Sequence, residues 1–281
     1  MFIAKKPIRI KNNAVYNQFQ CKFFQLNYMF QQKKNLLFIL ILILCCASCQ
    51  KKKWIVVQHA STKIAIDSTA ETSADKNYEA FLQPYKEQMA EKMDVVIGQA
   101  AQAMRVSRPE SLLSNFGADI TRKVGADYLG ENVDISIVNM GGLRTEISEG
   151  SITVGSIYEL MPFENELVIL WLRGDKVAEL CDAIASVNGE GVSGIKMGIK
   201  DGKVVEPTIG GKAVDMEKIY IIATSDYLAE GNDKLVQLAE YEKQEKTGIK
   251  IRDAFIDYIK NETEKGKQIN SQLDGRIYEI K

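Results

Sequence analysis

The sequence contains little of what metal and disulfide chemistry needs. Histidine occurs once, at His59, and cysteine five times in 281 residues. Two catalytic signatures are missing as well: a Gly-x-Ser-x-Gly nucleophile turn and a glycine-rich loop that ends in Gly-Lys-Ser or Gly-Lys-Thr. The sequence therefore offers neither of these catalysts, and it has no second imidazole to act with His59.

An excess of either charge is also absent. The 36 basic residues are matched by 37 acidic ones, and the formal net charge is -1. Proteins that bind nucleic acid usually carry a basic surface, often with aromatic side chains among the charges. Because the sequence has no such basic patch, we exclude nucleic acid as a partner.

A hydrophobic run of transmembrane length is lacking too. The apolar run from Leu36 to Leu44 is shorter than the roughly 20 residues that cross a bilayer as a helix. A positive flank after Met29 precedes it, and Cys46-Ala-Ser-Cys49 follows it. This order resembles a bacterial lipoprotein signal, although leucine is usual at the first lipobox position. We expect a lipidated Cys49 and a lipid-anchored envelope protein on the periplasmic or outer-membrane face; an uncleaved membrane anchor is the alternative.

The expected signal divides the chain into four parts. Residues 1–28 are an extension without periodicity, residues 29–48 the signal peptide, residues 49–76 a linker with a strand at 63–67, and residues 77–281 one domain. Pro-, Gly- or Ser-rich linkers are absent from the last part, which is why we predict a single domain. Processing would leave only the thiol of Cys181 free, so a disulfide framework is excluded.

The apolar pattern of the last part mixes helical and strand periods. It predicts helices over 77–93, 111–128, 155–160, 176–187 and 251–260, and strands over 94–98, 134–139, 166–173, 194–199, 203–205 and 219–224. The helix over 77–93 is amphipathic, with Tyr78, Phe81, Tyr85 and Met89 on one side. Since the order is neither a strict βαβ alternation nor all-β, we predict an α+β domain with one sheet system and helices on its outer faces.

Five short motifs follow one another along this domain. They are Asn139-x-Gly-Gly-x-Arg144, Gly150-x-Ile-Thr153, Pro162-Phe163-x-Asn165, Gly174 before a helix, and Tyr227-Leu-Ala-x-Gly-x-Asp233. In this order and spacing the sequence resembles the C-terminal domain of the 5'-nucleotidase family. The resemblance implies a layered α/β/β/α domain that holds the nucleoside part of a nucleotide.

The resemblance also implies roles for particular residues. Phe163 and Tyr227, the latter usually Phe in the family, would stack on a purine base at about 1 to 3 kcal/mol for each contact. Asp233 would accept hydrogen bonds from the ribose hydroxyls, and Arg144 would bind a phosphate with its planar fork of donors. The other predicted substrate-binding residues are Asn139 at a base edge, Gly141 and Gly142 in the turn, and Arg108, which we select over Arg105 ahead of the second helix.

Each role has an ordinary structural alternative. Phe163 would serve equally well as a core residue, and Asp233 as a turn residue that bonds its own backbone. Arg144 alone would fit a solvated surface ion pair, and Asn139 would fit a buried side chain that ties down the glycine turn.

The catalytic half of the family is the main departure. In the family, a separate N-terminal metallophosphatase domain holds two metal ions, which needs several His together with Asp and Asn. Because this sequence has only His59, we infer no metal site and no catalytic residue in this chain. We therefore expect a nucleotide-recognition subunit that needs no cofactor of its own and works with a separate metallophosphatase chain, which holds the divalent metals. The alternatives are a non-catalytic nucleoside- or nucleotide-binding lipoprotein and an envelope interaction protein.

Overall fold

The computed structural model describes residues 31–34, 36, 61, 63 and 75–281. The chain divides into two units, Met1–Thr72 and Ser73–Lys281, and the second contains nearly all described residues. Cys49, His59 and the predicted strand over 63–67, apart from Lys63, lie outside the described residues. The predictions about the signal, the lipid and this strand therefore stay predictions.

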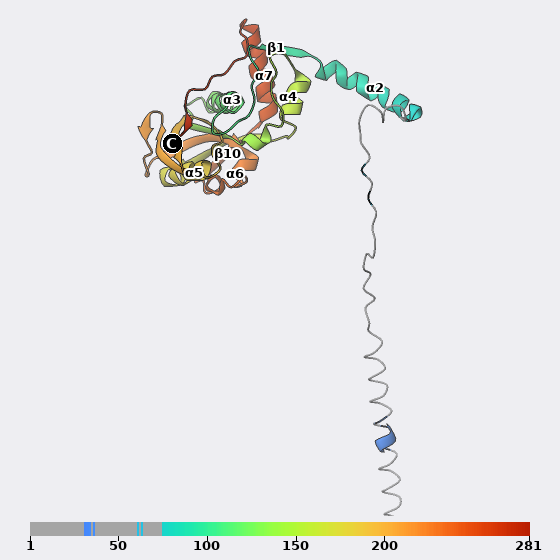
Figure 1. Cartoon of the computed structure of the whole chain (residues 1–281), viewed down its shortest axis with the longest axis horizontal. Helices are drawn as coiled ribbons and strands as arrows, with labels where there is room; N and C mark the ends of the chain where they lie inside the picture. Colours follow the sequence, from blue (N-terminus) through green and yellow to red (C-terminus); the bar gives the residue numbers. More distant parts are fainter. Residues whose placement is uncertain (1–30, 35, 37–60, 62, 64–74) are drawn as a thin grey trace, which may run out of the picture. The chain divides into compact units, whose positions relative to one another are not determined.

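The unit Ser73–Lys281 combines helices with strands (Figure 1). Its helices are α2 (Lys76–Met93), α3 (Leu112–Leu129), α4 (Val154–Leu160), α5 (Gly174–Ser186), α6 (Asp226–Ala229) and α7 (Ile251–Glu264), with 3-10 turns η2 (Met140–Gly142) and η3 (Val236–Ala239). Its strands are β1 (Val96–Ala100), β2 (Ile135–Val138), β3 (Gly150–Thr153), β4 (Glu166–Arg173), β5 (Gly191–Ser193), β6 (Ile195–Lys200), β7 (Lys203–Ile209), β8 (Lys212–Ala213), β9 (Ile219–Ser225), β10 (Lys243–Lys250) and β11 (Ile277–Glu279). This mixed order confirms the α+β prediction.

The strands form three sheets. A five-stranded sheet has the order β10-β4-β9-β2-β5, a four-stranded sheet the order β11-β6-β7-β8, and β1 pairs with β3. In the five-stranded sheet β2 and β9 are parallel, whereas β4 runs antiparallel to β9. The ends of β2 and β9 and the start of β4 therefore meet at one edge of this sheet.

The division into separate sheets differs from the predicted single sheet system, and Gly194 gives the physical reason. This residue lies between β5 and β6 with φ +83°. A Cβ atom there would lie 2.0 Å from the backbone oxygen of Asp134. Because glycine permits both the left-handed backbone and this close approach, the chain leaves the five-stranded sheet and starts the four-stranded one within a single residue.

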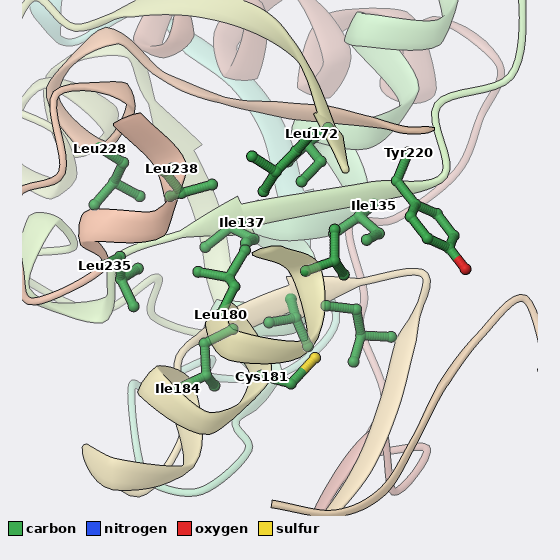
Figure 2. Close-up of a cluster of buried hydrophobic side chains, with 14 of the residues drawn as sticks. Ile135, Ile137, Leu172, Leu180, Cys181, Ile184, Tyr220, Leu228, Leu235 and Leu238 are labelled. Atoms are coloured by element: carbon green, nitrogen blue, oxygen red, sulfur yellow. The ribbon is translucent and has the colours of Figure 1, made fainter. Parts of the chain in front are cut away.

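The five-stranded sheet is buried on both faces. Along β4, Leu167 and Ile169 belong to one core with residues of α3 and α7, while Val168, Leu170 and Leu172 belong to a second core with α5 and the four-stranded sheet. Figure 2 shows side chains of β2, β4 and α5 meeting in this second core. Such two-sided burial explains why β4 reads as a continuous apolar run rather than an alternating one.

Cys181 lies in this second core and is fully buried. Burial raises the pKa of its thiol to about 12. The thiolate is the reactive form of cysteine, so Cys181 is an inert core residue at neutral pH.

The strand β10 escaped prediction because its sequence, Lys243-Gln-Glu-Lys-Thr-Gly-Ile-Lys250, is mostly polar. It pairs with β4 at the edge of the five-stranded sheet. Lysine and glutamate at an edge strand discourage further strand pairing with other chains, which accounts for the missing apolar signal.

The helix α2 matches the predicted amphipathic helix, but its apolar side is exposed. None of its residues is buried, and Tyr78, Phe81, Tyr85 and Met89, here called the α2 stripe, are each 57–62% exposed. The three aromatic rings follow one another at centroid distances of 6.4 and 5.6 Å. Among the described residues, no helix has the length and hydropathy needed to cross a membrane.

Candidate functional site

Three chain segments meet at the edge where β2 and β9 end and β4 begins. Asn139 follows β2, Tyr227 lies in α6 directly after β9, and Phe163 precedes β4. Antiparallel pairing of Leu167 with Ser225 holds the start of β4 beside the end of β9. Ligand sites in open α/β sheets gather at such carboxyl ends of strands, and this edge is therefore the candidate site.

The first segment turns sharply after Asn139. The Gly142 N–H donates to the Asn139 carbonyl at 3.0 Å, which closes the 3-10 turn η2. A Cβ atom on Gly142 would lie 2.9 Å from Oδ1 of Asn139, whereas one on Gly141 would meet nothing within 4 Å. A side chain at position 142 would thus have to displace the Asn139 amide, whereas the backbone angle at this position does not call for glycine.

A buried carboxylate supports this turn from behind. Glu190 is 5% exposed, and its Oε2 atom accepts a hydrogen bond of 2.6 Å from the Met140 N–H. Its Oε1 atom accepts from Nη2 of Arg108 at 2.6 Å, and Nη1 of Arg108 donates to the Val187 carbonyl at 2.8 Å. Arg108, a predicted substrate-binding residue, therefore contacts the turn through Glu190 and does not line the pocket described next.

A pocket of about 430 Å³ occupies the edge between the three segments. It is lined by Asn139, Gly141, Gly142, Arg144, Phe163, Asn165, Tyr227 and Asp233. The structure thus brings together seven of the eight predicted substrate-binding residues, all except Arg108. The volume lies in the range of about 300–1,000 Å³ that is typical of small-molecule sites.

Asp233 joins two of the segments across the pocket. Its Oδ2 atom accepts a hydrogen bond of 2.6 Å from Nδ2 of Asn139, and its Oδ1 atom accepts one of 3.0 Å from the hydroxyl of Tyr227. Asp233 has φ +54°, a left-handed backbone that aspartate tolerates better than most residues. A carboxylate has about four acceptor positions, so both oxygens can still accept further hydrogen bonds.

The hydrogen bond to Asp233 also affects Tyr227. It raises the pKa of the Tyr227 hydroxyl above its ordinary value of 10.0, with smaller contributions from desolvation and from the carboxylate charge. Tyr227 is 39% exposed and lines the pocket, so its ring is accessible to a ligand while its hydroxyl is held by Asp233.

Phe163 is 46% exposed and is not a core residue. The guanidinium carbon of Arg144 lies 5.2 Å from the centroid of its ring. A cation over an aromatic face is a favourable contact worth about 0.5–1 kcal/mol at exposed sites. The pocket therefore combines a positive charge with two accessible aromatic rings, Phe163 and Tyr227.

Two residues of the site were missed from the sequence. Asn165 lines the pocket, and its carbonyl accepts a hydrogen bond of 3.0 Å from the Ile251 N–H. It stands in the Pro162-Phe163-x-Asn165 motif, so the motif itself could have identified it. Glu190 follows the turn after α5 and has no such local signal, because its partners Arg108 and Met140 lie far away in the chain.

Within residues 75–281 and the few described residues before them, no three His, Cys, Asp or Glu side chains are grouped so as to hold a metal ion. The donors present in the described part of the chain thus do not fit the two metal ions of the family's catalytic domain.

Comparison with known proteins identifies the family of this chain. The family described as "5'-nucleotidase, C-terminal domain" matches residues 96–240, just over half of the chain. The chain is 23% identical over 198 residues to the 5'-nucleotidase of Vibrio cholerae, and 24% identical over 220 residues to Protein UshA of Escherichia coli. These alignments cover 68% and 76% of this chain.

Among solved structures, the 5'-nucleotidase precursor of Thermus thermophilus superposes with a TM-score of 0.60 at 28% identity, over 72% of this chain and 42% of its own. The chain covers 35% and 38% of the two curated relatives, little more than a third of their length. The matched region includes β1, β2, β4, β9 and α6, and with them the residues that line the pocket. The chain belongs to the 5'-nucleotidase C-terminal domain family.

Proposed function

We propose that this chain is the nucleotide-recognition half of a 5'-nucleotidase-type phosphohydrolase. The observation that carries the proposal is the pocket between the ends of β2 and β9, where two exposed aromatic rings, an arginine and a carboxylate converge. A purine nucleotide presents a flat base, a vicinal diol and a phosphate. Each of these groups has a suitable partner in the pocket.

The roles follow from the chemistry of the side chains. Phe163 and Tyr227 offer aromatic faces for a base, at about 1–3 kcal/mol for each stacked ring. Asp233 accepts hydrogen bonds from the ribose hydroxyls, and Arg144 binds the phosphate through its planar fork. Arg144 rests over Phe163 at 5.2 Å in the free protein, so a stacked base and this guanidinium would compete for the ring face.

We propose further that a separate metallophosphatase chain performs the hydrolysis. One histidine in 281 residues is too few for a site that holds two metal ions with several imidazoles. The divalent metals would be held by that partner, and the residues of this chain would bind and orient the nucleotide for it.

The α2 stripe supports a protein partner of this kind. Four large apolar side chains exposed along one helix are unusual on a surface that faces only water. The helix ends at Met93, directly before the matched region that begins at residue 96. Since that region is described as a C-terminal domain, the remainder of the relatives precedes it, and α2 stands on the side where that remainder joins. We therefore propose the metallophosphatase chain as the occupant of the stripe.

Calorimetry tests ligand recognition directly. The whole chain, titrated with AMP and with adenosine, should bind both, and Tyr227→Ala should weaken binding by about 1–3 kcal/mol. Absence of binding to either compound would refute recognition of nucleotides and nucleosides. Unaltered affinity in Tyr227→Ala would remove Tyr227 from the binding surface.

Phosphate release from AMP tests whether this chain binds the nucleotide while a separate chain hydrolyses it. Hydrolysis should require this chain, the metallophosphatase chain and a divalent metal together. Substantial hydrolysis by this chain alone would refute the proposal of a half enzyme. Nucleotide binding without any hydrolysis in the presence of the partner would favour the second candidate, a non-catalytic nucleoside- or nucleotide-binding envelope lipoprotein, which the same pocket would serve.

The membrane anchor is a separate part of the proposal. The signal-like segment with Cys49 supports a lipid-anchored protein of the cell envelope. Mass spectrometry of the mature protein should find an acylated Cys49 at its N-terminus. An unmodified Cys49 within a longer chain would contradict it.

A further inference from the structure

The loop that carries Phe163 is bound along its length by the start of α7. The Ile251 N–H donates to the Asn165 carbonyl at 3.0 Å, and Nζ of Lys250 donates to the Glu164 carbonyl at 2.9 Å. Arg252 contributes two longer contacts, from Nη1 to the Met161 carbonyl at 3.4 Å and from Nη2 to Oε1 of Glu164 at 3.3 Å. Arg252 thus contacts the chain on both sides of Phe163.

Arg252 is buried to a degree that is unusual for an arginine. The residue is 6% exposed, and its guanidinium carbon lies 3.9 Å from the centroid of the Tyr158 ring. Its Nε atom is buried without a hydrogen-bond partner in the described structure. The partner carboxylate of Glu164 is 73% exposed. Burying a charged group with incomplete hydrogen bonding is unfavourable, so this arrangement contributes little to stability by itself.

Arg252 lies beside the pocket but does not line it. Arg252, Met161, Phe163 and Asn165 line a narrow cavity of about 30 Å³ next to the site. Asn139, Gly142, Phe163 and Asn165 line both this cavity and the larger pocket, whereas Arg252 lines only the small cavity. The guanidinium therefore lies beneath the ligand-facing surface and does not itself face the proposed nucleotide.

We propose that Arg252 is a positioning residue for Phe163, which fixes the loop at Met161 and Glu164 so that the ring is held ready to stack on a base. This inference rests on the proposed function. The segment between α4 and β4 has no helix or strand of its own, and Phe163 is nearly half exposed. Without the guanidinium the ring would have to be ordered during binding, and that ordering lowers affinity.

Calorimetry on the whole chain with two ligands separates positioning from folding. AMP carries a base and ribose 5-phosphate does not, so only AMP can stack on the ring of Phe163. We expect Arg252→Met to weaken AMP binding about 3- to 10-fold and to leave ribose 5-phosphate binding within twofold. Arg122→Met is the matched control, because Nε of Arg122 also donates to a backbone carbonyl, that of Val133, outside the pocket.

A second readout follows the ring itself. A Phe163→Trp variant in a background with Trp54→Phe and Trp171→Phe reports the order of this side chain by fluorescence anisotropy. Adding Arg252→Met should lower the anisotropy of Trp at this position. Glu164→Gln, on an exposed side chain, should weaken AMP binding about 2- to 3-fold and supplies the test if Arg252→Met does not fold. Arg252→Lys keeps the charge but not the planar fork, and it should restore binding only in part.

The outcomes are distinct. Equal loss of both ligands in Arg252→Met would show a general structural role, and unchanged AMP binding would show no role; either overturns the inference. If Arg252→Met does not fold, unchanged AMP binding in Glu164→Gln overturns it. Failure of the unmodified chain to bind AMP would instead refute the proposed function itself.

Discussion

The residues at the pocket orient one another through hydrogen bonds between their side chains. Asp233 accepts from Asn139 and Tyr227, and Glu190 links Arg108 to the turn at Met140. Asn139, Tyr227 and Asp233 are therefore oriented by one another before any ligand is bound. Preorganisation of this kind reduces the ordering that binding requires.

The two glycines of the turn give a matched test at this scale. A Cβ atom on residue 142 would press on Oδ1 of Asn139 at 2.9 Å, but one on residue 141 would meet nothing within 4 Å. Gly142→Ala should displace Asn139, break its hydrogen bond to Asp233 and weaken AMP binding by about 0.5–1.5 kcal/mol. Gly141→Ala should bind nearly as well as the unmodified chain, measured by calorimetry. Equal affinities of the two variants would contradict the proposed contact.

Tyr227 permits a test by pH. Donation to Asp233 raises the pKa of the hydroxyl, so the bond is fully present below the ordinary value of 10.0 and is lost as the pH rises through the raised value. NMR of tyrosine labelled with 13C at Cζ, with the Tyr227 signal assigned from Tyr227→Phe, should show a midpoint above 10. Asp233→Asn should lower that midpoint. A midpoint that does not respond to Asp233→Asn would assign the shift to another cause.

At the scale of elements, strand direction creates the site. Because β2 and β9 are parallel and β4 is antiparallel to β9, two strand ends and one strand start meet at the same edge. Segments that begin at Asn139, Phe163 and Tyr227 are thereby brought to one pocket. The helix α2 takes no part in this arrangement, and none of its residues is buried.

The exposed helix carries its own prediction. Changing Phe81 and Tyr85 together to Ser should strongly reduce association with the metallophosphatase chain, because two buried aromatic contacts would be lost. Glu87→Ser, on the opposite side of α2, is the matched control. Ultracentrifugation of the mixed chains measures the association, and AMP binding by this chain should be the same in all variants. Undiminished association of the double variant would remove the α2 stripe from the interface.

The whole molecule depends on the passage from one sheet to the other. Gly194 makes this passage with a left-handed backbone and a backbone oxygen at 2.0 Å from its missing Cβ. A core that extends from the five-stranded sheet through α5 to the four-stranded sheet then holds the two sheets together.

Unfolding in urea should reveal this dependence. Gly194→Ala should destabilise the domain by roughly 3 kcal/mol, of which about 1–2 kcal/mol comes from the left-handed backbone and the rest from the clash. Gly202 also has a positive φ, but a Cβ atom there would meet nothing within 4 Å, so Gly202→Ala should cost only the backbone part. Similar unfolding midpoints for the two variants would show that the backbone moves to avoid the clash at position 194 without any loss of stability.

Much of the fold and of the site follows from local patterns. The ranges of α3 and β4 were predicted closely because the apolar periodicity of α3 and the continuous apolar run of β4 are both local. Seven pocket residues were predicted from motifs that place them next to strand ends. In contrast, β10 was not predicted because its sequence is mostly polar. The apolar periodicity of α2 predicted a helix but could not predict that its apolar side would be exposed.

By itself, the sequence determined most of the helices, the strongly apolar strands, the α+β class and the family, because these depend on short-range periodicity and on motifs in a fixed order. Only the tertiary structure decided which of these residues act together. The pairs Asn139 with Asp233, Arg108 with Glu190, and Arg252 with Met161 are separated by 94, 82 and 91 positions. Strand order and sheet packing bring these residues together, so their contacts cannot be predicted from their spacing along the chain.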